Sequence, residues 1–337
     1  MNKSLYFFIL LFMFLITSCG VFQKEEEEKK IETHSTDFNF VQIILDWFPN
    51  ANHAGLYSAI KYDHFIENRI NISIEAPSDP ATILSLVSTD NIDFGIFYQP
   101  DLLLAQNEGI PVVAVASIVN KPLNAIMSLK DSKINSPFDL AGKKIGYPGI
   151  DWNRSMLATM LESEGLTIYD VELIDVGWSL APALMSGEVD AIIGAYWTHE
   201  SIVMENEGFE VSIIMPDQWG VPPYYELVLV TSEDTLNQNP NLVKRMVKAV
   251  SSGYTTALND GSDALTALIS MTPPSVDIEV ERAGIELLVP IWSNNQNPEF
   301  GYIDSDRWNE FVDWMKLRDQ LPKDFDGDAS FSNEFFD

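Results

Sequence analysis

Short apolar runs alternate with amphipathic stretches along most of the chain. From about residue 38 the apolar runs predict buried strands at 41–45, 72–75, 94–97 and 112–117, then at 144–147, 171–176, 191–194, 210–214 and 225–231. The stretches between them predict helices at 52–62, 80–88, 100–108, 152–164, 180–185 and 197–207, followed by helices at 241–259, 263–270, 277–288 and 304–318. Strands that alternate with helices are typical of α/β folds built on parallel sheets.

The alternating region contains a repeated phrase. Asn91-Ile92-Asp93-Phe94-Gly95-Ile96 and Glu188-Val189-Asp190-Ala191-Ile192-Ile193-Gly194 hold matching places in two successive series of strands. About 300 residues follow the amino-terminal segment, which is enough for two domains with cores of their own. The repetition therefore predicts two similar α/β halves.

The amino terminus carries the marks of export. Lys3 precedes an apolar segment at 5–16, which is too short to cross a bilayer and is typical of a signal-peptide core. The segment ends in Ile16-Thr17-Ser18-Cys19-Gly20, which resembles a lipobox and contains the only cysteine of the chain. We favour a lipid anchor on Cys19 over a buried core cysteine, and a single cysteine excludes disulfides. We thus expect a signal peptide at 1–18 and an extracytoplasmic protein held at a membrane.

Charge narrows the range of partners. The tract Gln23-Lys24-Glu25-Glu26-Glu27-Glu28-Lys29-Lys30 predicts a solvated tether within 19–38. The formal net charge of −30 argues against nucleic acid or an anionic membrane face as a partner. We expect no metal, no cofactor and no catalytic residue, and we expect a monomer.

The stretch 45–57 carries the strongest candidate chemistry. Asp46, Trp47, Asn50 and His53 surround a Pro49-containing turn between a predicted strand and a predicted helix. Ligands of open α/β sheets bind at the carboxyl ends of strands. An aromatic face with several polar groups suits a small planar heterocycle, although Trp47 could also be an ordinary core tryptophan.

Four further segments add candidates. Tyr98 ends a strand of the first half, and Tyr196, Trp197 and Glu200 follow a strand of the second. A carboxylate suits a ligand with an exocyclic amine, because it accepts the hydrogen bonds that the amine donates. Glu200 is the first choice for that contact and Glu226, beside Tyr225, the second; the alternatives are a helix N-terminal charge for Glu200 and a hinge ion pair for Glu226. Gly149 and Trp152 belong to a loop at a predicted helix N-terminus, where free N–H groups could hold a carbonyl or an anion.

The motifs resemble those of one family. The pattern Leu-Asp-Trp-x-Pro-Asn-x-x-His-x-Gly-x-Tyr at 45–57, together with Tyr-Trp-x-His-Glu at 196–200, is similar to motifs of the NMT1/THI5-like solute-binding proteins. This resemblance implies the type II periplasmic binding protein fold, in which two α/β lobes are joined by two crossover segments. It places the crossovers near 119–124 and 216–226, with lobe 1 at 39–120 plus 226–337 and lobe 2 at 121–225.

The same resemblance implies a function. Similar family members are lipoproteins that capture a thiamine pyrimidine precursor, such as N-formyl-4-amino-5-aminomethyl-2-methylpyrimidine, for an ABC permease driven by a separate ATPase. The ring would stack on Trp47 and Tyr98 and bind Asp46, Asn50 and Glu200. Riboflavin or another planar heterocycle is the alternative ligand, whereas sulfonate and nitrate carriers would want cationic sites.

An enzyme reading is less favoured. The family's pyrimidine synthase needs a lysine where this chain has Phe97, and a cysteine cluster where it reads Tyr225-Glu226-Leu227-Val228. Both departures remove the chemistry that the synthase requires. We therefore expect a binding protein and not an enzyme.

Overall fold

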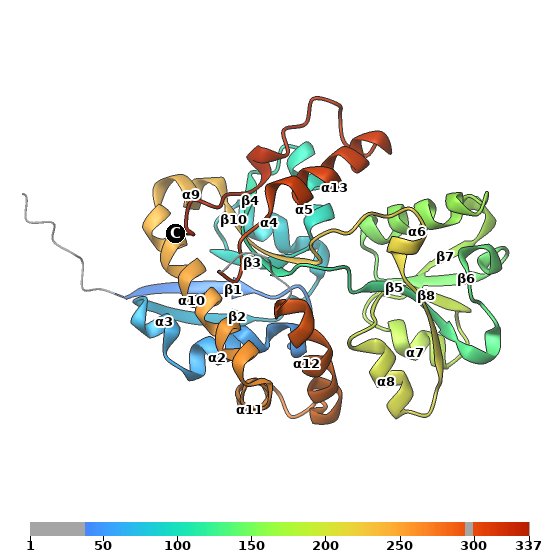
Figure 1. Ribbon diagram of the computed structural model, residues 1–337, viewed down its shortest axis with the longest axis horizontal. Coiled ribbons are helices and arrows are strands. Elements are labelled where there is room, and N and C mark those ends of the chain that lie inside the picture. Colours follow the sequence, from blue (N-terminus) through green and yellow to red (C-terminus); the bar gives the residue numbers. More distant parts are fainter. Residues whose placement is uncertain (1–37, 294–298, 337) are drawn as a thin grey trace, which may run out of the picture. The chain divides into compact units, whose positions relative to one another are not determined.

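Two five-stranded mixed sheets organise the chain (Figure 1). The computed structural model describes residues 38–293 and 299–336. Sheet A has the order β2 (Ile70–Glu75), β1 (Asn39–Ile44), β3 (Phe94–Phe97), β10 (Leu227–Ser232), β4 (Val112–Val119). Sheet B has the order β7 (Glu172–Asp175), β6 (Lys144–Tyr147), β8 (Ala191–Tyr196), β5 (Asn124–Leu129), β9 (Val211–Ile214). The predicted α/β class with two lobes is confirmed, and we call the half around sheet A lobe 1 and the half around sheet B lobe 2.

The two sheets share one topology. In sheet A, β2, β1 and β3 are parallel neighbours, and β10, from a distant part of the chain, pairs antiparallel with β3. In sheet B, β7, β6 and β8 are parallel neighbours, and β5, from a distant part of the chain, pairs antiparallel with β8. The repeated phrase explains part of this likeness. Asp93 accepts a hydrogen bond from the Gln42 backbone N–H at 2.7 Å, and Asp190 accepts one from the Lys144 N–H at 2.9 Å. Each aspartate thus joins the strand that follows it, β3 or β8, to the neighbouring parallel strand, β1 or β6.

Helices cover both sheets. Lobe 1 carries α2 (Ala54–Lys61), α3 (His64–Glu67), α4 (Ile83–Ser88), α5 (Gln99–Asn107), α9 (Glu233–Gln238), α10 (Pro240–Asn259), α11 (Gly261–Met271), α12 (Ile278–Ser293) and α13 (Ser305–Leu317). Lobe 2 carries α6 (Asp151–Ser163), α7 (Leu180–Met185) and α8 (Glu200–Asn206) (Figure 1). In α10 the apolar positions Val243, Met246, Val247 and Val250 recur at helical spacing and are buried. This apolar stripe lies on the side of α10 that packs on the rest of lobe 1.

Several predicted boundaries were wrong. The prediction omitted β5: it placed a crossover near 119–124 and assigned no element to 125–129. It also omitted α9, and it began α8 at Trp197 instead of Glu200. The Trp197 N–H bonds to the carbonyl of Leu123 on the other chain segment, so tertiary pairing delays this helix.

Glu226 joins the two crossover segments. Its Oε2 accepts from the backbone N–H groups of Leu123, at 2.6 Å, and Asn124, at 3.0 Å, and from the Tyr224 hydroxyl at 3.0 Å. The residue is fully buried. The alternative that Glu226 forms a hinge ion pair was wrong, because its hydrogen-bond partners are neutral N–H and O–H groups and not a cation. We propose that the lobe boundaries lie near these contacts, as the sequence predicts.

The amino-terminal predictions lie outside the described residues. They comprise the signal peptide, Cys19 and the charged tether. Among the described helices, none combines the length and apolar character needed to cross a membrane.

Candidate functional site

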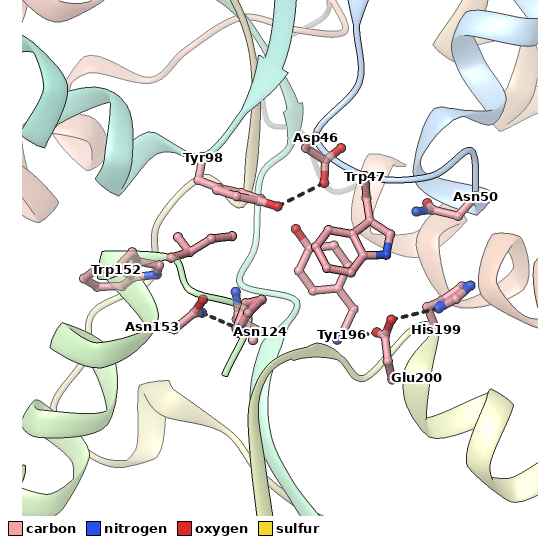
Figure 2. A pocket seen from close by; sticks show the side chains of 13 residues that line it. Asp46, Trp47, Asn50, Tyr98, Asn124, Trp152, Asn153, Tyr196, His199 and Glu200 are labelled. Atoms are coloured by element: carbon pink, nitrogen blue, oxygen red, sulfur yellow. Dashed lines mark hydrogen bonds and ion pairs between the residues drawn. The ribbon is translucent and has the colours of Figure 1, made fainter. Parts of the chain in front are cut away.

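A pocket lies where the carboxyl ends of strands from both sheets approach each other. About 450 Å³ of space, part of it open to solvent, lies between its walls. Figure 2 shows lobe 1 residues Asp46, Trp47 and Tyr98 across the pocket from lobe 2 residues Asn153 and Glu200. The lining consists of Asp46, Trp47, Asn50, Tyr98, Asn124, Pro148, Ile150, Trp152, Asn153, Gly194, Tyr196, His199 and Glu200. The sequence-predicted residues Asp46, Trp47, Asn50, Tyr98, Trp152, Tyr196 and Glu200 are thus brought together.

The turn after β1 is held by its own polar side chains. Asn50 caps the short helix η1 (Ala51–His53), with Oδ1 accepting from the Asn52 N–H at 2.9 Å. The Asn50 backbone N–H donates to His53 Nδ1 at 3.2 Å, so the other ring nitrogen carries the hydrogen. His53 Nε2 therefore donates to Asp46 Oδ1 at 2.8 Å. His53 orients Asp46 from behind and does not line the pocket.

Asp46 also receives a donor from Tyr98. The Tyr98 hydroxyl donates to Asp46 Oδ2 at 3.3 Å, and both residues are buried. Burial, followed by the neighbouring Asp46 charge, raises the pKa of Tyr98 well above its ordinary value. Tyr98 consequently keeps its proton, and both oxygens of Asp46 are hydrogen-bonded inside lobe 1.

The acidic group of lobe 2 has different partners. Glu200 begins α8, and its Oε2 accepts from the Tyr196 N–H at 2.7 Å. Its Oε1 lies 3.1 Å from His199 Nδ1, while His199 Nε2 lies 3.4 Å from Oε1 of Glu281 in α12. Glu281 in turn accepts from the Ala51 N–H of lobe 1. His199 therefore connects a lobe 2 carboxylate to a lobe 1 carboxylate.

The two carboxylates set the charge of His199. Burial alone would lower its pKa, but Glu200 and Glu281 outweigh that cost and raise the pKa of His199 to about 10. Burial would likewise raise the pKa of Glu200, yet the charge and hydrogen bond of His199 lower it. The group is an imidazolium held between two carboxylates.

An aromatic contact connects Trp47 with lobe 2. The ring of Trp178, which lies between β7 and α7, is 3.8 Å from that of Trp47 and 4.7 Å from that of Phe48, measured between centroids. The Trp47 and Trp178 planes are inclined by 57°. Trp47 thus contacts lobe 2 as well as the pocket, and sequence reasoning missed Trp178.

Some predicted site residues lie elsewhere. Trp197 donates from Nε1 to the Pro122 carbonyl at 3.3 Å, beside a crossover. Tyr225 accepts the Asp304 N–H at its hydroxyl and packs on Trp308 inside lobe 1. Gly149, at φ 78°, makes the turn between the lining residues Pro148 and Ile150. With His53 and Glu226, these residues support the pocket without lining it.

The structure adds residues that the sequence analysis did not select: Asn124, Pro148, Ile150, Asn153, Gly194 and His199. His199 and Asn153 stand next to the selected Glu200 and Trp152, so their positions were visible in the same motifs. Asn124 carried no signal, because the strand that holds it was not predicted.

Comparisons with known proteins agree with this architecture. The model of the family described as NMT1/THI5 like matches residues 50–264. A formylaminopyrimidine-binding protein of Halalkalibacterium halodurans is 34% identical over 329 residues, covering 96% of this chain and 97% of the relative. A putative thiamine biosynthesis protein of Haemophilus influenzae is 32% identical, covering 84% and 88%. The alkanesulfonate-binding protein SsuA of Xanthomonas axonopodis pv. citri has a TM-score of 0.68 at 15% identity, covering 89% and 100%, and supports the periplasmic binding protein fold.

Proposed function

Because the chain belongs to the NMT1/THI5-like family, we propose that it captures a thiamine pyrimidine precursor between its lobes for an ABC importer. The proposed ligand is N-formyl-4-amino-5-aminomethyl-2-methylpyrimidine or a close analogue. The relative of 34% identity is named for binding a formylaminopyrimidine, and it matches this chain over nearly its full length.

One observation in the pocket carries the proposal. The lining contains two carboxylates, three asparagines and the rings of Trp47, Tyr98, Trp152 and Tyr196, and none of the described lining residues is lysine or arginine. The imidazolium of His199 is already neutralised by Glu200 and Glu281. Such a lining favours an uncharged planar ring with N–H donors over a sulfonate or another anion.

Capture would couple to closure of the lobes. The ring would stack on Trp47 and Tyr98 of lobe 1 while polar groups of lobe 2 bind its edge. Only the closed arrangement brings both sets of groups to one ligand, so the ligand shifts the population toward closure. The closed protein would then deliver its ligand to a permease that a separate ATPase drives.

The proposed location follows from the amino terminus. We infer an extracytoplasmic protein, anchored through Cys19 after removal of residues 1–18. Cys19→Ser should release the protein from the membrane fraction, and continued membrane association would contradict the anchor.

The ligand is tested by calorimetry and thermal shift on the chain from residue 20 onward. The panel contains the formylaminopyrimidine, the unformylated aminopyrimidine, thiamine, riboflavin and an alkanesulfonate. A ligand at 100 times its dissociation constant stabilises the folded state by about 2.7 kcal/mol. We expect that stabilisation with the aminopyrimidines. Stabilisation by riboflavin alone, or by the sulfonate alone, would overturn the proposed ligand class.

A further inference from the structure

A chain of amide groups runs from the crossover carboxylate to the pocket. Glu226 Oε1 accepts from Asn124 Nδ2 at 3.2 Å, and Asn124 Oδ1 accepts from Asn153 Nδ2 at 3.2 Å. Figure 2 shows Asn124 and Asn153 joined by the second of these bonds, across the pocket from Tyr98 and Asp46. We call Glu226, Asn124 and Asn153 the amide relay.

The donors around Glu226 fix the direction of this relay. Leu123 N–H, Asn124 N–H and the Tyr224 hydroxyl donate to Oε2. Burial raises the pKa of Glu226, and these hydrogen bonds oppose that rise by stabilising the carboxylate, which has no hydrogen to return. Asn124 must therefore turn its NH₂ group toward Glu226 and its oxygen toward Asn153. Asn153 must then donate from Nδ2 to Asn124, so its Oδ1 is the side-chain atom that has yet to find a partner.

That remaining atom is a buried acceptor without a donor. Asn153 is 1% exposed, and its Oδ1 has no hydrogen-bond partner among the described residues. A buried acceptor without a donor costs free energy, which a donor from a ligand would recover.

The neighbouring backbone leaves room beside this acceptor. Gly194, at φ 99°, faces it, and a Cβ there would lie 3.2 Å from Asn153 Oδ1 and 2.6 Å from Pro148 Cδ. Any side chain at this position would fill the space that a donor needs.

We propose that Asn153 Oδ1 accepts a hydrogen bond from the exocyclic amine of the ligand, and that Glu226 is the positioning residue that sets this polarity through Asn124. The inference rests on the proposed function and refines it. Both oxygens of Glu200 already accept, from Tyr196 N–H and from His199, whereas Asn153 Oδ1 accepts from nothing among the described residues. In this assignment Glu200 stabilises the closed lobes, and Asn153 selects an amine over a carbonyl at the same ring position.

Glu226→Gln tests the relay because it inverts the polarity at nearly constant shape. The amide oxygen of the substituted side chain would remain on the three donors, so its NH₂ group would face Asn124. Asn124 would then turn over, followed by Asn153, and Asn153 would present NH₂ to the pocket. Calorimetry with the 4-aminopyrimidine and its 4-oxo counterpart gives the affinity ratio for each protein. We expect this amino-to-oxo ratio to fall by at least about tenfold in Glu226→Gln, the scale of one exchanged hydrogen bond.

Tyr224→Phe is the matched control. It removes one donor from Glu226 Oε2 and leaves the relay direction unchanged, so the amino-to-oxo ratio should stay as in the unmodified protein. Equal weakening of both ligands in Glu226→Gln would show a merely structural role and would overturn the inference.

Asn153→Ala tests the acceptor without touching the crossover. We expect at least about tenfold weaker binding of the 4-amino compound and little change for the analogue lacking the amine. An unchanged preference for the amine would overturn the inference even if Glu226→Gln does not fold. If the unmodified protein binds none of these pyrimidines, the proposed function itself fails, which is a separate result.

Discussion

The two walls of the pocket each present a carboxylate, but the two carboxylates are held in different ways. Asp46 of lobe 1 receives His53 Nε2–H and the Tyr98 hydroxyl, both from its own lobe. Glu200 of lobe 2 receives His199, whose other nitrogen faces Glu281 of lobe 1. Asp46 is therefore oriented whether the lobes are open or closed, whereas the surroundings of Glu200 are complete only when the lobes meet.

Because of this difference, changes to one wall should affect ligand binding directly, and changes to the other should affect closure of the lobes. Groups of the lobe 1 wall form a preorganised face, and changes there should lower the affinity directly. Groups that span the lobes should act through the closed state, and they should respond to pH. Groups that only join strands within a sheet should alter stability and leave binding intact.

The largest expected effect belongs to Trp47. Trp47→Ala removes the stacking face, and it should weaken binding by at least about 100-fold because burial and stacking are both lost. Calorimetry measures the affinity, and circular dichroism checks that the fold is retained. Trp178→Ala, which removes the ring packed on Trp47 from lobe 2, should cost less. An unchanged affinity in Trp47→Ala would refute the stacking role.

The next effect belongs to Glu200. Glu200→Gln keeps the shape but removes the charge that holds His199, and binding should weaken by about tenfold or more. Calorimetry should show the loss with aminopyrimidine and with its des-amino analogue alike, since Glu200 stabilises closure. A loss confined to the amine-bearing ligand would move the amine contact from Asn153 to Glu200.

A smaller, pH-dependent effect belongs to His199. Its pKa is raised to about 10 by the two carboxylates, so the charged form favours the folded, closed state. This stabilisation is complete below the ordinary pKa of about 6.5 and is lost as pH rises toward 10. Over this interval we expect the affinity to fall several-fold and the melting temperature to fall by a few degrees. His199→Asn should flatten both profiles, and an unchanged slope in that variant would assign the pH dependence to another group.

The smallest effect on binding is expected for Asp93 and Asp190, the aspartates of the repeated phrase. Asp93→Asn and Asp190→Asn each weaken one hydrogen bond to a strand N–H, and each should lower the free energy of unfolding by about 1 kcal/mol. Denaturant titration measures the loss, and calorimetry should give unchanged affinities. A large loss of affinity in either variant would show that strand joining and ligand binding are coupled.

Much of the fold was visible in the sequence. The apolar runs and the repeated Asp93 and Asp190 phrases predicted two α/β halves, because the periodicity of buried strands is a local pattern and the phrase recurs in the sequence itself. Strand β5 was missed, since nothing in 124–129 says that it pairs between β8 and β9. The start of α8 was misplaced for a related reason, because the bond from Trp197 N–H to Leu123 lies outside any local window.

By itself the sequence determined most of the elements, the lobes' common plan and the motif around Asp46, because these depend on periodicity and on neighbours a few residues apart. Only the tertiary structure decided which polar atoms keep a free lone pair. Glu226 looked like a ligand contact until the backbone of the other crossover was seen to satisfy it, and Asn153 had no apparent role until Asn124 fixed its orientation. Hydrogen-bond capacity is consumed by whichever donors the fold brings near, and those donors come from residues far away in the chain.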